Sequence, residues 1–221
     1  MRNQFRDRQE AGELLAEKLT AYADQPGLLV LALPRGGVPV GAEVAKKLHA
    51  PLDVFVVRKL GLPGHPELAM GAIASGGVRV LNGDVVNTLR ISDEVINAVT
   101  AEEFQELKRR EQSYRDDLSP PEVEGKTVII VDDGIATGST MMAAISALRQ
   151  LNVGRVVVAT PTVARATCDY LRESADEVVA VIVPETFYGV GQWYEDFSQT
   201  SDEEVHRLLG VMNHRHTPAA A

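Results

Sequence analysis

The sequence predicts an α/β fold: a mostly parallel β-sheet with helices on both faces and a small flap near the C-terminus. Two observations lead to this prediction. Short, uninterrupted apolar runs alternate with segments of helical periodicity, which is typical of strands buried on both faces of a parallel sheet. In addition, 45% of the residues are hydrophobic but only 5% are aromatic. A core rich in valine, alanine and leucine suits such a sheet better than it suits a β-sandwich.

The N-terminal half contains the first strands and the helices between them. Residues 9–24 have helical spacing with leucines on one side, and Gly27 precedes an apolar run that ends before Pro34. The pattern predicts a helix over 9–24, a strand over 28–33, a helix over 38–49 and a second buried strand over 52–57. The Gly- and Pro-rich residues 61–67 are predicted to form a loop.

The middle of the chain shows antiparallel and helical signals. Residues 72–82 hold a Gly-Gly pair between two β-prone halves, which predicts a hairpin. Ser92 precedes a long charged segment and is a residue type that caps helices, so we predict a helix from there to about residue 115.

The C-terminal half repeats the alternation of strand and helix after the breaker SPPEVEG. It predicts a strand over 127–133, a helix over 139–151, a strand over 156–161, a helix over 163–174 and a strand over 177–184. Residues 185–210 interrupt this rhythm with most of the chain's ring residues and then a short helix, which indicates a flap over the edge of the sheet. We expect a single domain over 1–221, with its core at about 27–184, the flap at about 185–210 and a disordered tail at 213–221.

Composition excludes several classes of function. The formal net charge is −9 and no long basic run is present, which argues against a surface for nucleic acid. Cys168 is the one cysteine of the chain, so neither an intrachain disulfide nor a cysteine-based zinc cluster can form. No apolar run approaches the roughly 20 residues of a membrane helix, and the N-terminus lacks a signal-peptide core. We therefore expect a cytoplasmic protein without a membrane partner.

Ligands of open α/β sheets bind at the carboxyl ends of the strands. Three candidate loops leave predicted strands there, at residues 34–37, 58–67 and 132–140. The third, in VIIVDDGIATGST, is the most informative. Two carboxylates end a buried strand, and a loop of small residues leads into a helix N-terminus, whose free N–H groups and dipole favour a phosphate.

The side chains of this loop suit a ribose phosphate. Gly138 permits close approach of the backbone, and hydroxyl donors flank it at Thr137, Ser139 and Thr140. The carboxylates of Asp132 and Asp133 suit ribose hydroxyls or a metal ion beside the phosphate. The loop is not a Walker A loop, because no lysine follows its second glycine, and it is not a dinucleotide fingerprint, because the acidic pair precedes it.

The segment VIIVDDGIATGSTM resembles the 5-phosphoribosyl-1-pyrophosphate (PRPP) binding motif of the type I phosphoribosyltransferases. The resemblance implies that Asp132 and Asp133 hold the ribose 2′- and 3′-hydroxyls and Mg²⁺. It implies that the loop holds the 5′-phosphate through Ala136, Thr137, Gly138, Ser139 and Thr140. It also implies a Mg²⁺-dependent transfer of ribose 5-phosphate to an acceptor, with release of pyrophosphate, by a homodimer.

Three other segments match the family more weakly. LPRGG resembles its short pyrophosphate loop, which implies pyrophosphate contacts for Arg35, Gly36 and Gly37. VRKLG is similar to the entrance of the mobile catalytic loop in orotate-type members, which assigns Arg58 and Lys59 to the pyrophosphate. VGQWYEDF is similar to the hood of the 6-oxopurine enzymes, so two aromatic residues are candidates to stack on an acceptor ring, Phe187 and Trp193.

The acceptor and the general base stay open. Many 6-oxopurine enzymes have an aspartate base where this chain has Ala136, as adenine-type members do. Glu67 and His65 are candidate bases, and a purine-like acceptor is suggested by the aromatic flap alone. Two other functions use the same cradle: a PRPP-sensing regulator without catalysis, and a PRPP pyrophosphohydrolase or a fragment of a PRPP synthetase.

Overall fold

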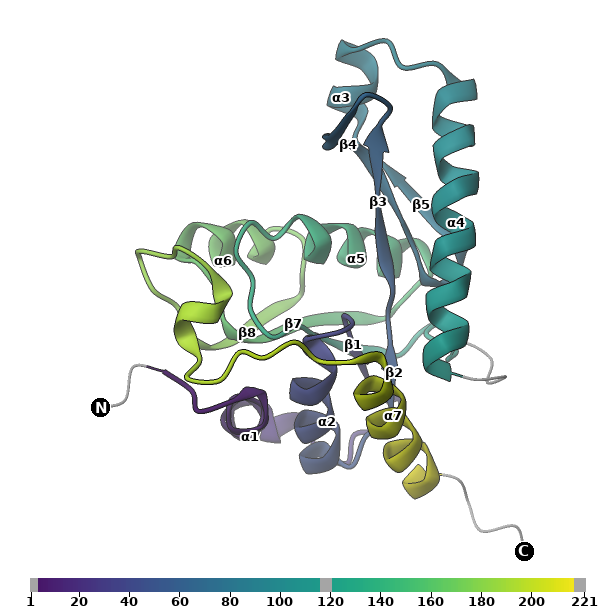
Figure 1. Cartoon of the computed structure of the whole chain (residues 1–221). Helices are drawn as coiled ribbons and strands as arrows, with labels where there is room; N and C mark the ends of the chain where they lie inside the picture. The colour runs from purple at the N-terminus through teal and green to yellow at the C-terminus, as the bar shows by residue number, and fades with distance from the viewer. Residues whose placement is uncertain (1–3, 116–120, 217–221) are drawn as a thin grey trace, which may run out of the picture.

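The computed structural model describes residues 4–115 and 121–216 and contains two β-sheets (Figure 1). The larger sheet has the strand order β2-β1-β6-β7-β8, and all of its neighbouring strands are parallel. Its strands are β1 (Leu28–Ala32), β2 (Leu52–Val54), β6 (Thr127–Val131), β7 (Arg155–Thr162) and β8 (Glu177–Ile182). The predicted parallel sheet is confirmed, because each of its apolar runs forms one of these strands.

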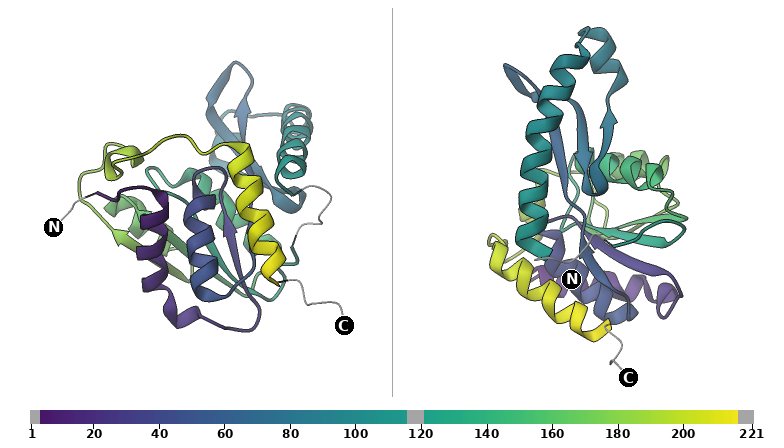
Figure 2. Two further views of the ribbon diagram at one scale, coloured as in Figure 1. Left: turned by 60° about the horizontal axis from the view of Figure 1, so that its bottom comes forward. Right: turned by 90° about the vertical axis from the view of Figure 1, so that its right-hand side faces the viewer.

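Helices cover both faces of this sheet, as predicted (Figures 1 and 2). One face is covered by α1 (Arg8–Lys18), α2 (Gly37–Leu48) and α7 (Asp202–His216), and the other by α5 (Ser139–Gln150) and α6 (Arg165–Arg172). Each central strand therefore buries side chains on both sides, and β1 is buried along its whole length. The strand order reverses direction between β1 and β6, which creates a switch point at their carboxyl ends.

The smaller sheet stands upright on the larger one (Figure 1). It is antiparallel, in the order β3-β4-β5, and α4 runs along it. Its elements are β3 (Val57–Leu62), β4 (His65–Ala74), β5 (Val78–Leu81), α3 (Gly83–Thr88) and α4 (Asp93–Arg115). The predicted hairpin at 72–82 and the predicted long helix to residue 115 are both confirmed.

Two predictions in this region are wrong. The run 52–57 is not one strand, because β2 ends at Val54 and Val57 already belongs to the other sheet. Residues 61–67 are not a loop but the tip of the β3–β4 hairpin. Register shifts at Gly61 allow the pairing there, and a Cβ at this glycine would lie only 2.8 Å from the Pro66 carbonyl oxygen. Gly and Pro therefore mark an irregular hairpin here.

The C-terminal segment also differs from the prediction. The expected disordered tail was 213–221, whereas α7 continues to His216 and residues 217–221 lie outside the described residues. The flap is confirmed as an irregular segment, with a single 3₁₀ turn over Val190–Trp193. Within the described residues, no helix has the length and apolarity needed to cross a bilayer.

A buried arginine connects α4, which packs on the smaller sheet, to β2 of the larger sheet. Arg115, at the end of α4, is 5% exposed, and its Nε lies 2.7 Å from Asp53 Oδ1 on β2. Its Nη1 pairs with Glu111 at 2.9 Å, and its Nη2 donates a hydrogen bond to the Val54 carbonyl oxygen. Because Asp53 sits in this buried environment, removal of the arginine would leave its charge without compensation.

We expect Arg115→Met to lower the free energy of unfolding by about 3–5 kcal/mol, the cost of breaking a buried ion pair from one side. Arg109→Met is the matched control, since Arg109 pairs with Glu106 on the exposed face of the same helix. That variant should change stability by less than about 1 kcal/mol. Urea denaturation of both variants measures the difference, and equal losses would contradict this account of Arg115.

Candidate active site

The loops after β1 and β6 meet at the switch point. A Cβ built on Gly36 would lie 2.0 Å from Asp133 Oδ2, and one on Gly37 would lie 2.7 Å from the Val131 carbonyl oxygen. A side chain at Gly36 would therefore displace the Asp133 carboxylate, and one at Gly37 would displace the backbone at the end of β6. The structure brings together the first and third loops that the sequence singled out.

The two carboxylates of the acidic pair lie in different surroundings. Asp132 accepts a hydrogen bond from the backbone N–H of Asp133 at 2.9 Å. Burial, followed by the neighbouring charge of Asp133, raises the pKa of Asp132 well above its ordinary value. Asp133 forms an ion pair instead, with Arg8 Nε 2.8 Å from its Oδ2. The hydroxyl of Tyr194 donates to the Asp133 carbonyl oxygen at 2.5 Å.

The loop after the acidic pair has the geometry of an anion cradle. Gly138 has a φ of 76° and caps the N-terminus of α5, where the first backbone N–H groups have no partner within the helix. The hydroxyls of Thr137 and Ser139 lie 3.3 Å apart. The loop is held from α6, because Thr167 donates a hydrogen bond to the Ala136 carbonyl oxygen at 2.6 Å.

A cavity of about 380 Å³ extends from this cradle toward the smaller sheet. Ser139 and Thr140 line one end, and Lys59 of β3 lines it as well. Lys59 Nζ lies 3.5 Å from Glu67 Oε2, and both side chains are solvent-accessible. The smaller sheet thus places the positively charged side chain of Lys59 in the cavity that begins at the cradle.

Arg58 points away from Lys59, as neighbours on a strand do. Its guanidinium contacts Glu103 of α4 at 2.7 Å, and it does not line the cavity. Arg35 lies at the other loop, 3.7 Å from Asp202 of α7. Asp202 also accepts from the hydroxyl of Tyr114 at 3.0 Å, and burial, followed by this bond, raises the pKa of Tyr114 to about 12. Arg35 and Lys59 therefore lie on different elements, and of the two it is Lys59 that lines the cavity beside the cradle.

The flap covers the loop after β6. A Cβ on Gly134 would lie 2.3 Å from Val190 Cγ1, so the 3₁₀ turn rests directly on this glycine. Phe187 and Trp193 form a tilted pair with ring centroids 6.1 Å apart. Among the described residues, Trp193 Nε1 has no hydrogen-bond partner although it is buried.

Sequence reasoning missed two residues of this site, Arg8 and Tyr194. Tyr194 lies in the predicted flap, and burial raises its pKa above the ordinary value for a tyrosine. Arg8 occupies the first turn of α1, where the helix dipole disfavours a cation. That unfavourable placement was the one sequence signal that it has a partner elsewhere.

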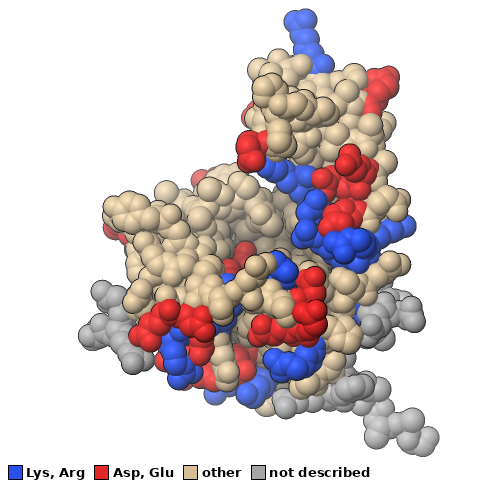
Figure 3. Space-filling model, in the orientation of Figure 1, with Lys and Arg blue, Asp and Glu red and all other residues tan. Residues whose placement is uncertain are grey.

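The acidic pair fits Mg²⁺ only as part of a shared site. Among the described residues, no group of three or more His, Cys, Asp and Glu side chains is arranged to hold a metal ion. Mg²⁺, however, commonly takes one or two carboxylates and completes its shell with water and substrate phosphates. Asp132 and Asp133 would supply such oxygens beside the two glycines of the first loop. On the face in Figure 3, basic and acidic side chains are interspersed around the hollow between the two sheets.

Comparisons with known proteins agree on one family. A family model for the phosphoribosyl transferase domain matches residues 3–197. A Mycobacterium tuberculosis H37Rv protein with the provisional name of phosphoribosyl transferase is 47% identical over 205 residues, which is 93% of this chain. The chain spans about half the length of that relative, 46%. The crystal structure of TT1426 from Thermus thermophilus has a TM-score of 0.83 at 41% identity and covers 95% of this chain and 99% of its own.

Proposed function

The chain belongs to the phosphoribosyl transferase family, and on that premise we propose that it transfers ribose 5-phosphate from PRPP to an acceptor and releases pyrophosphate. One observation supports this proposal above the others. The acidic pair, the Gly36–Gly37 turn and the left-handed Gly138 meet at a single switch point. Ribose hydroxyls, pyrophosphate and 5′-phosphate each have a matching donor or acceptor set there.

In the proposed reaction, a lone pair of the acceptor forms a bond to ribose C1 while the bond from C1 to the pyrophosphate oxygen breaks. The electron pair of the broken bond leaves with pyrophosphate, and the acceptor's proton goes to a general base or to solvent. Asp132 and Asp133 orient the ribose, and the first turn of α5 holds the 5′-phosphate. The positive charges of Arg35 and Lys59 stabilise the negative charge that develops on pyrophosphate. Mg²⁺, held by the acidic pair together with the substrate, would neutralise further charge on the leaving group.

The flap supports a ring-shaped acceptor. Phe187 and Trp193 offer an aromatic surface next to the loop after β6, and opening of the flap would expose the buried Trp193 Nε1 as a donor. A purine-like base has both a π-face and acceptor nitrogens, so it matches these two features. We therefore propose purine-like bases as the first acceptors to test.

The proposal is tested by pyrophosphate release from PRPP and Mg²⁺ with a panel of nucleobases and amines. Release that depends on one acceptor supports a transferase and identifies the acceptor class. Release without any acceptor indicates a pyrophosphohydrolase instead. PRPP binding without release across the panel indicates a sensor, and no PRPP binding at all would overturn the proposal.

The tip of the β3–β4 hairpin should respond to substrate. Residues 60–68 are mostly solvent-accessible and their pairing is irregular, so their amides should exchange quickly in the free protein. Closure of the hairpin tip, with Lys59, over bound PRPP and Mg²⁺ would slow amide exchange in these residues.

Hydrogen exchange with and without PRPP and Mg²⁺ measures this effect, with α3 (Gly83–Thr88) as an internal reference that should not change. Protection confined to residues 132–140 would contradict a lid role for the hairpin and remove the proposed part of Lys59.

A further inference from the structure

Arg8 is held by three separate contacts at the back of the acidic pair. Its Nε lies 2.8 Å from Asp133 Oδ2, its Nη1 donates to the Ser198 carbonyl oxygen at 2.6 Å, and its guanidinium carbon lies 4.0 Å from the centre of the Phe197 ring. The side chain is only 12% exposed. An arginine fixed by an ion pair, a carbonyl and an aromatic ring has little rotational freedom.

The start of α1 is built to present this arginine. Asp7 caps the helix by accepting the Glu10 N–H at 2.8 Å, which fixes the first turn. Phe5 is buried, and its N–H donates to the Trp193 carbonyl oxygen at 2.8 Å, which ties the segment to the flap. Gly12 lies against α2 so closely that a Cβ would be 2.9 Å from the Val40 carbonyl oxygen. These contacts fix the backbone around Arg8, whose side chain extends toward Asp133.

The ion pair determines which oxygen of Asp133 is available. Oδ2 receives Arg8 and faces Gly36, so Oδ1 is the oxygen left for another hydrogen bond. Asp132, the adjacent carboxylate, is half-buried, and Asp133 would otherwise face it without a compensating cation. We propose that Arg8 is a positioning residue, which holds the Asp133 carboxylate in the orientation that binds a ribose hydroxyl. This inference rests on the proposed function.

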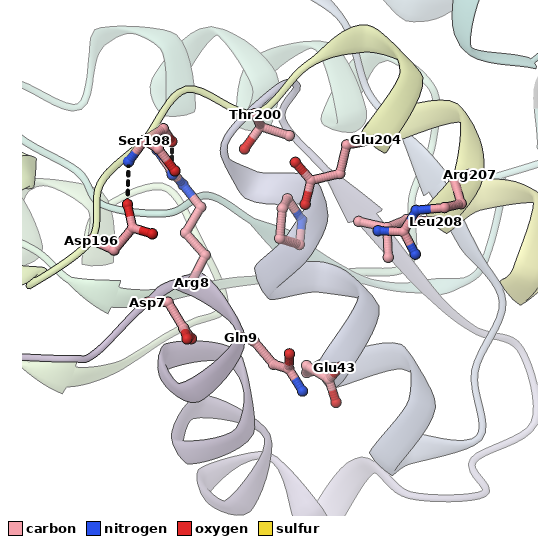
Figure 4. A pocket seen from close by; sticks show the side chains of 11 residues that line it. Asp7, Arg8, Gln9, Glu43, Asp196, Ser198, Thr200, Glu204, Arg207 and Leu208 are labelled. Carbon is pink, nitrogen blue, oxygen red and sulfur yellow. Dashed lines mark hydrogen bonds between the residues drawn. The ribbon is translucent and has the colours of Figure 1, made fainter.

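A cavity on the other side of Arg8 makes the role testable by chemical rescue (Figure 4). Its volume is about 370 Å³, and it lies between the first turn of α1, α2 and α7. Besides Arg8, its charged lining residues are Asp7, Glu43, Asp196, Glu204 and Arg207. Truncation of Arg8 to alanine would open this cavity toward Asp133. Its acidic lining would then admit a small cation such as guanidinium.

The experiment measures binding of ribose 5-phosphate, which carries the ribose hydroxyls and the 5′-phosphate but needs no metal ion. We expect Arg8→Ala to weaken this binding by roughly 10-fold or more, the loss of a charge-assisted contact. Millimolar guanidinium chloride should restore part of the affinity of Arg8→Ala and leave the wild type unchanged. In steady-state assays, Arg8→Ala should raise KM for PRPP more than it lowers kcat. Pyrophosphate binding should be unaffected.

Arg207→Ala, which changes a second arginine of the same cavity, is the matched control and should bind ribose 5-phosphate like the wild type.

A double-mutant cycle separates the proposed role from general support of the fold. If Arg8 acts through Asp133, Arg8→Ala should cost little further affinity in an Asp133→Asn background. Equal effects in both backgrounds, or no rescue by guanidinium, would overturn the inference.

If Arg8→Ala does not fold, Arg8→Gln retains a donor without the charge and should also weaken binding. Wild-type affinity in that variant would overturn the inference too. A wild-type chain that binds neither PRPP nor ribose 5-phosphate would refute the proposed function itself, whereas normal binding by both wild type and Arg8→Ala refutes only the role of Arg8.

Discussion

Replacement of both Asp132 and Asp133 by asparagine is expected to lower phosphoribosyl transfer by at least ~10²-fold while the fold stays intact. Asparagine preserves the side-chain volume but removes the charges that orient the ribose and hold Mg²⁺. The change also leaves Arg8 without its anionic partner. Initial rates of PRPP-dependent pyrophosphate release measure the loss, and circular dichroism checks the fold.

A matched control separates this effect from the change in net charge. Asp84 and Asp169 are both exposed and lie on other helices, so their double replacement by asparagine removes the same two charges away from the site. We expect its turnover to be close to that of the wild type. Wild-type turnover in the Asp132/Asp133 variant would refute the assignment of the acidic pair.

Gly138→Val is expected to abolish binding of ribose 5-phosphate and of PRPP. Gly138 has a φ of 76°, a conformation in which a β-branched residue is strained. A Cβ there would lie 2.8 Å from Thr167 Cγ2, on the side chain that holds the loop through Ala136. The substitution therefore distorts the turn that presents the first N–H groups of α5 to a phosphate. Pyrophosphate should still bind, because its proposed contacts come from Arg35, the two glycines that follow it, and Lys59.

Gly125→Val provides the control for backbone strain alone. Gly125 has a φ of 69°, but a Cβ there meets nothing within 4 Å. Both variants should therefore lose stability from the left-handed backbone, whereas only the variant at Gly138 should lose phosphate binding. Calorimetry with ribose 5-phosphate, PRPP and pyrophosphate measures the three affinities. If PRPP binds the Gly138 variant unchanged, the loop is not a phosphate cradle; loss of all three ligands with an intact fold would mean that the two halves of the site are not separable.

Local pattern was sufficient for the parallel sheet and for the cradle. The central strands β1, β6 and β7 each contain a contiguous apolar run, and burial on both faces makes such runs recognisable without knowledge of their partners. The cradle is equally local, since the acidic pair, the left-handed glycine and the helix N-terminus all lie within residues 132–141. The carboxyl ends of parallel strands lie at one edge of the sheet. The contact between the cradle and the Gly36–Gly37 turn therefore also followed from the fold class.

The β3–β4 hairpin of the smaller sheet was misassigned because its signals conflict. Gly61 and Pro66 mark a loop by composition, yet they sit in a hairpin whose register shifts absorb them. β5 pairs only with Gly71–Ala74, so the missing N–H of Pro66 removes no bond from that ladder. The alternation of the strand also separates Arg58 from Lys59, and only the packing of α4 determines which of them faces the cavity.

The partner of the acidic pair lay beyond any local pattern. Arg8 and Asp133 are 125 residues apart, and their ion pair exists because α1 packs on α2 while the flap carries Ser198 and Phe197 over the guanidinium. Composition and spacing identify sites that one continuous segment forms with its own backbone, as at a helix N-terminus. They cannot identify pairs of side chains whose distance depends on how separate elements pack. The local sequence was therefore enough to recognise the phosphate cradle, and the three-dimensional packing determined which charges surround it.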